Sequence, residues 1–223
     1  ATANAARMCN APVGLADVDP VTGNVTLATI KAAVEAASFK VRAIAIVHLG
    51  GRPCEMIAIS AYAKSIGAYL VEDACHAPLA EYNDAAGASF TVGSCAHSDA
   101  ATLSFHAIKH ITAGEGGVLL TNSDTLAKQA RLFRSHGMVR DPSELKNQEN
   151  AGAPWYYEMH ELGYNYRLSE VSCALALNQV SRLATNNQRR QEIAALYHQH
   201  LGGMDFIKLP EIISPENGSH AWH

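Results

Sequence analysis

The sequence predicts an α/β fold built on a mainly parallel sheet. One observation is a strand–helix–strand succession within residues 42–72, because such a unit nearly always crosses over right-handed and joins two parallel strands. The other is composition: 48% hydrophobic and 17% charged residues in 223 are typical of a globular protein with a full-sized core. This length allows one large α/β domain, or one domain and the start of another.

The strand–helix–strand unit begins with a short apolar run at 42–47, which is rich in β-branched residues and followed by turn residues at 50–53. Residues 54–66 then carry apolar side chains at helical spacing and end at Gly67, a usual position for a helix stop. A second apolar run at 68–72 indicates the next strand.

Polar side chains follow both strands of this unit. His48 comes after the first strand, and Asp73 and His76 come after the second. Ligands of open parallel sheets gather beyond the carboxyl ends of the strands, so we expect these three side chains at a binding edge.

Two further strands are predicted at 100–105 and 117–121. The loop between them carries His106, Lys109 and His110. The sequence therefore predicts that Lys109 is displayed on a loop between two strands.

The second half of the chain is predicted to be mostly helical. Asp124 is placed to cap a helix, whereas the polar, proline-broken stretch at 139–154 predicts an excursion or a flexible loop. Helical spacing returns at 168–184 and again at 188–201, which predicts two helices. A new unit is expected to begin near Gly202.

Charge and cysteine content exclude several classes of protein. A net charge of −4 gives no reason to expect a nucleic-acid partner. No apolar run approaches the roughly 20 residues that cross a bilayer, and the N-terminus lacks the regions of a signal peptide, so we expect a cytoplasmic protein.

The five cysteines are scattered and predict reduced thiols. Cys75 with His76, and Cys95 with His97, match no standard zinc spacing, so no metal site is predicted.

An acidic residue at a strand end and a loop lysine form the informative pair. Pyridoxal phosphate needs a lysine amine for a Schiff base, a carboxylate beside its ring nitrogen and hydroxyl groups for its phosphate. Lys109, Asp73 and Ser104 are residues of these types. Taken alone, a loop lysine is usually a solvated surface residue, and Asp73 could equally cap the following turn.

Four long motifs occur in order along the chain: VEDACHA at 71–77, SFHAIKHITAGEGG at 104–117, FRSHGM at 133–138 and GYNYRLSE at 163–170. Together they resemble the DegT/DnrJ/EryC1/StrS sugar aminotransferases, and the resemblance covers essentially the whole chain. It implies the type I fold of pyridoxal-phosphate-dependent transferases, a mainly parallel sheet sandwiched by helices. With PWYYE at 154–158, the chain most resembles the pseudaminic-acid branch, which aminates UDP-linked 4-keto-6-deoxy-N-acetyl sugars.

The resemblance implies a role for each residue that matches a family motif. Lys109 would form the Schiff base with pyridoxal 5′-phosphate and then move the proton between cofactor and substrate carbon. Asp73 would pair with the pyridine nitrogen, and His76 would approach the phenolic oxygen. Ser104 would bind the phosphate.

Two further positions are implied to act across a subunit boundary. Asn165 would reach the phosphate of the neighbouring subunit's cofactor, which makes a homodimer the functional unit. Arg167 would help to shape the part of the site that the neighbouring subunit contributes, and to bind substrate. From the residues alone, Asn165 could instead stabilise a turn, and Arg167 could pair only with Glu170.

The implied reaction moves an amino group from glutamate to a keto-sugar nucleotide. There are two alternatives to this function. A sugar dehydratase of the same fold works without a Schiff-base lysine, so Lys109 disfavours that reading. A non-catalytic or truncated family member, acting only through its fold or dimerisation, stays open.

Family members are longer than this chain at both ends. We therefore expect residues 1–201 to form the large cofactor-binding domain without its N-terminal part, and residues 202–223 to open a truncated small C-terminal domain. The absent part includes a helix start that usually binds the cofactor phosphate.

Overall fold

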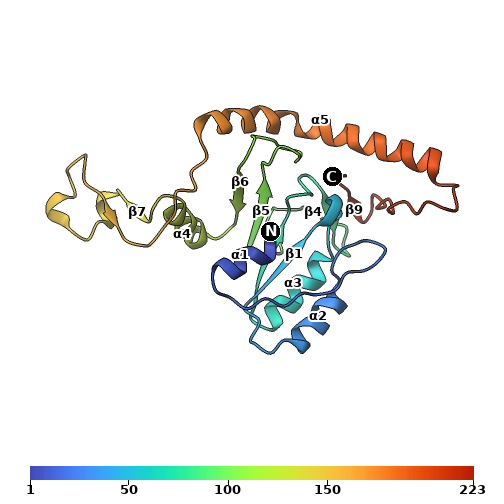
Figure 1. Cartoon of the computed structure of the whole chain (residues 1–223), viewed down its shortest axis with the longest axis horizontal. Helices are drawn as coiled ribbons and strands as arrows, with labels where there is room; N and C mark the ends of the chain where they lie inside the picture. The colour runs from blue at the N-terminus through green and yellow to red at the C-terminus, as the bar shows by residue number, and fades with distance from the viewer.

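The computed structural model describes residues 1–223 and has a four-stranded central sheet (Figure 1). Its strand order is β1-β2-β5-β6, formed by Ala43–Val47, Tyr69–Asp73, Ala100–Ser104 and Gly117–Leu120. The first three strands are parallel, and β6 runs antiparallel to β5. The predicted α/β class with a mainly parallel sheet is confirmed.

The predicted strand–helix–strand unit is present as β1, α3 (Met56–Ser65) and β2. The helix ends just before Gly67, whose φ of 65° lies in the left-handed region that glycine adopts without strain. Helix α3 packs against β2, and α2 (Leu27–Ala36) packs against α3. The core between them includes the fully buried Ile46, Met56, Ile59 and Leu70. Burial of each such side chain contributes roughly 1.5–3 kcal/mol.

Several elements were not anticipated from the sequence. Helix α1 (Thr2–Met8) opens the chain, and α2 is held by a reciprocal cap between Thr26 and Thr29. A second, antiparallel sheet has the order β4-β3-β9, formed by Ser89–Thr91, Glu81–Asn83 and Gly218–Ser219. Strand β9 therefore brings the C-terminal segment back onto the body of the protein.

Two helix predictions need correction. The cap of α4 (Asp124–Arg134) is Ser123, whose side chain accepts from the Leu126 N–H, while Asp124 lies inside the first turn. The two helices predicted at 168–184 and 188–201 are one continuous helix of 32 residues, α5 (Glu170–Leu201), capped by Ser169. The segment contains neither glycine nor proline, so its polar residues do not interrupt the hydrogen-bond ladder.

The predicted excursion projects from the end of α4, away from the sheet (Figure 1). It comprises β7 (Met138–Val139), two short 3₁₀ turns at Pro142–Glu144 and Gln148–Asn150, and β8 (Glu158–Met159). Strands β7 and β8 pair antiparallel. No helix of the structure combines the length and the apolar character that a membrane span requires.

Candidate active site

Asp73 ends strand β2 and presents a half-buried carboxylate at the carboxyl edge of the parallel strands. The Thr2 hydroxyl donates to Oδ2 at 2.6 Å, and the Cys75 N–H donates to Oδ1 at 3.3 Å. Burial alone would raise the pKa of Asp73, but the hydrogen bonds from Cys75 and Thr2 outweigh it, so the pKa lies below its usual value. Asp73 is thus ionised at neutral pH.

Lys109 lies on the loop that leaves the sheet at Ser104 and returns at Gly117, and these two residues are paired across β5 and β6. The Phe105 N–H also donates to the Gly116 carbonyl at 2.8 Å. The loop is therefore closed at its base, and the predicted display of Lys109 between two strands is confirmed.

The amine of Lys109 has no carboxylate partner: none of the ion pairs in the structure includes it. Its Nζ lies 3.4 Å from Nε2 of His223. The pKa of His76 is lowered by burial and by the charge of Lys109, while the charge of Asp73 opposes the change. Lys109 contacts His223, whose ring stacks on His76, and His76 follows Asp73 by three residues, so these side chains belong to one cluster.

The charges of both Lys109 and Asp73 act on the pKa of His76. Its Nδ1 accepts from the Gly50 N–H at 3.3 Å, and its ring stacks on His223 with centroids 4.1 Å apart. Because the pKa of His76 is lowered, the imidazole is neutral at pH 7.

The last residues of the chain complete the cluster, which sequence reasoning missed. The Ala221 N–H donates to the Gly51 carbonyl at 2.9 Å, and the His223 N–H donates to the Gly50 carbonyl at 2.8 Å. Gly51 has a φ of 98°, and a Cβ there would lie 2.7 Å from the Trp222 nitrogen. Only glycine therefore lets the terminal segment approach this closely.

His110, next to Lys109, also holds the terminal segment. Its Nε2 donates to the Ala221 carbonyl at 3.0 Å, and the side chain is buried with Nδ1 unpartnered. Burial lowers the pKa of His110 and outweighs the hydrogen bond to Ala221. His76, His110 and His223 thus lie together, with His223 more than 100 residues along the chain from Lys109. No local sequence pattern predicts such a long-range contact.

Ser104 ends β5 at the same edge of the sheet. Its neighbour two residues back, Thr102, pairs with Asp73 in the parallel register. The Ser104 hydroxyl accepts from the His106 N–H at 3.3 Å, and its own proton is free to donate to a ligand.

Asn165 and Arg167 are exposed, and no hydrogen bond or ion pair joins either to the Lys109 cluster. Their segment runs beside the end of α4, where the His136 N–H donates to the Tyr164 carbonyl and the Tyr166 N–H donates to the Arg134 carbonyl. The ion pair of Arg167 with Glu170 that the sequence left open does not form.

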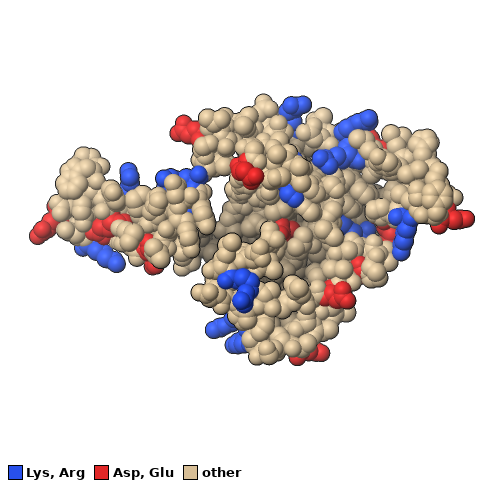
Figure 2. All heavy atoms as spheres, in the orientation of Figure 1, with Lys and Arg blue, Asp and Glu red and all other residues tan.

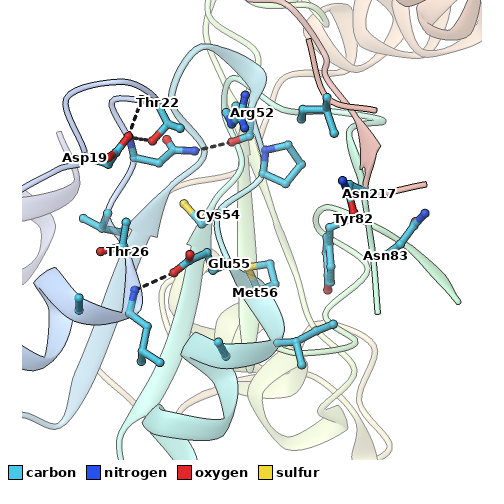
Figure 3. Close-up of a pocket in the computed structure, with 18 of the residues that line it drawn as sticks. Asp19, Thr22, Thr26, Arg52, Cys54, Glu55, Met56, Tyr82, Asn83 and Asn217 are labelled. Atoms are coloured by element: carbon cyan, nitrogen blue, oxygen red, sulfur yellow. Dashed lines mark hydrogen bonds between the residues drawn. The ribbon is translucent and has the colours of Figure 1, made fainter. Parts of the chain in front are cut away.

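A cavity of about 970 Å³ opens on another part of the molecule (Figure 3). It lies among the loop before α2, the start of α3 and strand β3, with Arg52, Glu55 and Asn83 on its walls. Neither Asp73 nor Lys109 lines it. We place the candidate site at Lys109, because convergent ionisable groups indicate chemistry more directly than size does.

The face shown in Figure 2 has no second concentration of charge. On the face shown in Figure 2, basic and acidic side chains are interspersed rather than gathered in a patch of one sign. No group of three or more His, Cys, Asp or Glu side chains has the arrangement of a metal site.

A parallel sheet with an ionised carboxylate at its carboxyl edge and an unpaired lysine on the adjoining loop defines an α/β protein with the donor set of a pyridoxal-phosphate site. The chain belongs to the DegT/DnrJ/EryC1/StrS aminotransferase family, whose family model matches residues 1–223.

Relatives are similar over most of this chain. The spore coat polysaccharide biosynthesis protein SpsC of Bacillus subtilis is 35% identical over 100% of the chain and 53% of its own length. The UDP-4-amino-4,6-dideoxy-N-acetyl-beta-L-altrosamine transaminase of Campylobacter jejuni is 39% identical over 88% of the chain and 47% of its own length. The chain thus spans about half the length of the curated relatives it matches.

Solved structures agree with this placement. PseC of Helicobacter pylori, described as an aminotransferase involved in the biosynthesis of pseudoaminic acid, superposes with a TM-score of 0.75 at 29% identity. The match covers 89% of this chain and 47% of that one. The aminotransferase fold implied by the sequence resemblance is confirmed.

Proposed function

We propose that the protein is a pyridoxal-phosphate-dependent aminotransferase that moves an amino group from glutamate to a keto-sugar nucleotide, of the UDP-4-keto-6-deoxy-N-acetylhexosamine type. The observation that carries the proposal is the union of ionised Asp73 and unpaired Lys109 in one cluster at the sheet edge. The sugar class is supported by the Campylobacter jejuni transaminase, 39% identical, whose name gives a UDP-linked amino sugar.

The residues of the cluster fit pyridoxal phosphate. Lys109 has no carboxylate that would hold its amine as an ion pair, and Asp73 offers a half-buried negative charge to a protonated ring nitrogen. When bound, the cofactor supplies an electron sink for the bond changes at the substrate carbon.

Each residue then has a definite task. Lys109 holds the cofactor covalently and afterwards carries the proton to and from the substrate carbon. Asp73 keeps the ring nitrogen protonated, His76 approaches the phenolic oxygen, and the Ser104 hydroxyl donates to the phosphate.

The functional unit in this proposal is a homodimer. Asn165 and Arg167 are exposed and apart from the Lys109 cluster, as residues serving a neighbouring subunit would be. Large apolar side chains on α5 are also exposed, among them Val171 at 74% and Leu177 at 73%. Exposed large apolar side chains of this kind are typical of an interaction surface.

Location and domain limits complete the proposal. All five cysteines are free thiols, which fits the reducing cytoplasm. Residues 1–201 would be the cofactor-binding domain and 202–223 the start of a second one, although β9 and buried Ala221 pack onto the first.

The test is the absorbance of the purified protein with added pyridoxal phosphate, followed by borohydride reduction and peptide mapping. We expect a visible band and a label on Lys109. Lys109→Ala should abolish both, whereas Lys128→Ala, which removes an exposed lysine paired with Glu144, should change neither. A folded protein that takes up no label would contradict the proposal.

A further inference from the structure

Two fully buried polar side chains, His48 and Glu72, lie next to Asp73 of the candidate site. His48 follows β1 and is 0% exposed, and Glu72, on β2 immediately before Asp73, is 1% exposed. His48 Nε2 lies 3.1 Å from Glu72 Oε2. Buried ionisable groups are costly unless every polar atom has a partner, so their partners decide what the pair does.

The hydrogen bonds fix the protonation of His48. The Cys54 N–H points at Nδ1 from 3.0 Å, and a backbone N–H can only donate, so Nδ1 accepts. The ring proton is therefore on Nε2, which donates to Glu72. His48 is a neutral imidazole, and the contact is a hydrogen bond rather than an ion pair.

Glu72 is an anion that accepts hydrogen bonds from three groups. Oε2 also accepts from the Gly93 N–H at 3.1 Å, and Oε1 accepts from the Ser98 hydroxyl. Burial raises the pKa of Glu72, but the hydrogen bonds from His48 and Ser98 outweigh it and lower the pKa. A charged carboxylate is thus fixed within the sheet, one residue from Asp73.

The segment of His48 also binds the site itself. The His48 N–H donates to the Asp73 carbonyl at 3.2 Å, and the Gly50 N–H donates to Nδ1 of His76 at 3.3 Å. Because side chains alternate along a strand, Glu72 and Asp73 point to opposite faces of β2. His48 therefore holds β2 through two consecutive residues, the second of which carries the site carboxylate.

We propose that His48 is a positioning residue, which through Glu72 and the Asp73 backbone fixes the direction in which the Asp73 carboxylate projects. The proposal rests on the proposed function in one respect: Asp73 is taken as the partner of the cofactor's ring nitrogen. His48 itself touches neither cofactor nor substrate in this arrangement.

Two substitutions separate the two bonds of the imidazole. His48→Gln places an amide N–H near the position of Nε2 and keeps the donor to Glu72. His48→Asn places an oxygen near the position of Nδ1, so it keeps the acceptor for Cys54 and loses the donor. Asn is shorter than His and Gln is more flexible, so each variant also perturbs packing. The difference between the two variants therefore reports on the hydrogen bond to Glu72.

The first measurement is amide hydrogen exchange over residues 71–77 in the cofactor-free protein. His48→Asn should speed exchange there about tenfold, the scale of one lost buried hydrogen bond, and His48→Gln should stay within about twofold of wild type. Ile59→Val, a trimmed core residue with no link to Asp73, serves as the control for general destabilisation. Equal exchange in the Asn and Gln variants would overturn the proposal.

The second measurement is the dissociation constant of pyridoxal phosphate with the pH titration of its visible band. His48→Asn should weaken binding about tenfold, with a shifted titration, while His48→Gln and Ile59→Val should not. Looser exchange with an unchanged affinity and titration would leave His48 a purely structural residue and defeat the proposal. If wild type binds no cofactor, the proposed function fails, and the exchange experiment still decides whether His48 holds the Asp73 strand.

If the His48 variants do not fold, a substitution of Glu72 tests the same hydrogen bond. Glu72→Gln keeps the shape of the carboxylate and removes its charge, and it should loosen 71–77 in the same way. Removing this negative charge should also lower the pH at which the bound cofactor's band titrates, because a nearby anion favours the protonated ring. No change in either measurement would contradict the role assigned to the pair.

Discussion

Lys109 and His223 face each other across 114 residues of sequence, with Nζ and Nε2 3.4 Å apart. Burial, together with His76 and Lys109, lowers the pKa of His223 to about 4, so its imidazole is neutral at pH 7. A pKa this low makes the imidazole a weak base, but its free nitrogen can accept a hydrogen bond from the Lys109 amine and orient it, and an amine must be unprotonated to attack a carbonyl.

This relationship predicts a kinetic effect. His223→Phe keeps a ring stacked on His76 but removes the nitrogen that faces Lys109. The visible band with pyridoxal phosphate should then form about tenfold more slowly, less than the roughly 10²–10⁴-fold of a full general-base effect because His223 is a weak base. Stopped-flow absorbance checks it, and an unchanged rate would show that His223 only packs.

Thr2→Val should weaken the binding of pyridoxal phosphate about tenfold, the lower end of what the lost hydrogen bond is worth. The substitution removes the hydroxyl that donates to Asp73 Oδ2 at 2.6 Å, and one hydrogen bond to a charged group is worth about 1.5–3 kcal/mol. Its loss should also raise the pKa of Asp73. Fluorescence titration measures the affinity, with Thr22→Val in the distant cavity wall as the control.

Much of this site could be predicted because its main groups are local to β-strand ends. Asp73 follows an apolar run, and Lys109 lies between two such runs, so each position can be read within ten residues. Thr2 and His223 could not be placed, since their contacts depend on where the two ends of the chain pack. The sequence predicts two helices separated at residues 185–187, whereas α5 is continuous there and buries Asn187.

Stability should fall as the pH falls from about 6.5 toward 4. Four histidines have folded-state pKa values lowered below their usual value, so the unfolded chain takes up protons in this range that the folded protein does not: His76, His110, His220 and His223. Stability is therefore full above pH 6.5. Calorimetry at pH 7.5 and 5.0 should give a Tm lower at pH 5.0 by on the order of 5 °C.

His220 provides the check on this assignment. Burial, with a smaller effect of Arg52, lowers its pKa to about 4, and its Nδ1 accepts from the Trp222 N–H at 3.0 Å. His220→Asn offers an oxygen to the same N–H and does not titrate. It should flatten the pH dependence of the Tm, and an unaltered dependence would contradict the role of His220.

Gly51→Ala should be far more harmful than Gly67→Ala. Both glycines have positive φ, but a Cβ at Gly51 would lie 2.7 Å from the Trp222 nitrogen, whereas nothing lies within 4 Å of one at Gly67. Gly67→Ala should cost roughly 1–2 kcal/mol of unfolding free energy from the backbone alone. Gly51→Ala should cost more and release the terminal segment, as urea unfolding and proteolysis would show; equal costs would argue against the close approach.

Leu177→Asp should separate the proposed homodimer into monomers. The side chain is 73% exposed on α5, and a charge placed in an apolar interface is not compensated. Light scattering after size exclusion gives the mass directly. Gln188→Asp, on the same helix, should leave the mass unchanged, and a monomeric wild-type protein would contradict the dimer.

Because β5 and β6 pair antiparallel, the lysine loop connects two neighbouring strands directly and does not cross over the sheet. The chain leaves and re-enters the same edge, and the pairing of Ser104 with Gly117 closes the loop at its base. We therefore expect changes in the length of the projecting 139–154 segment to leave the position of the Lys109 amine unaltered, because the loop is closed at its base without that segment. The Lys109 loop and the projecting 139–154 segment can thus be varied separately, by protein engineering or in evolution.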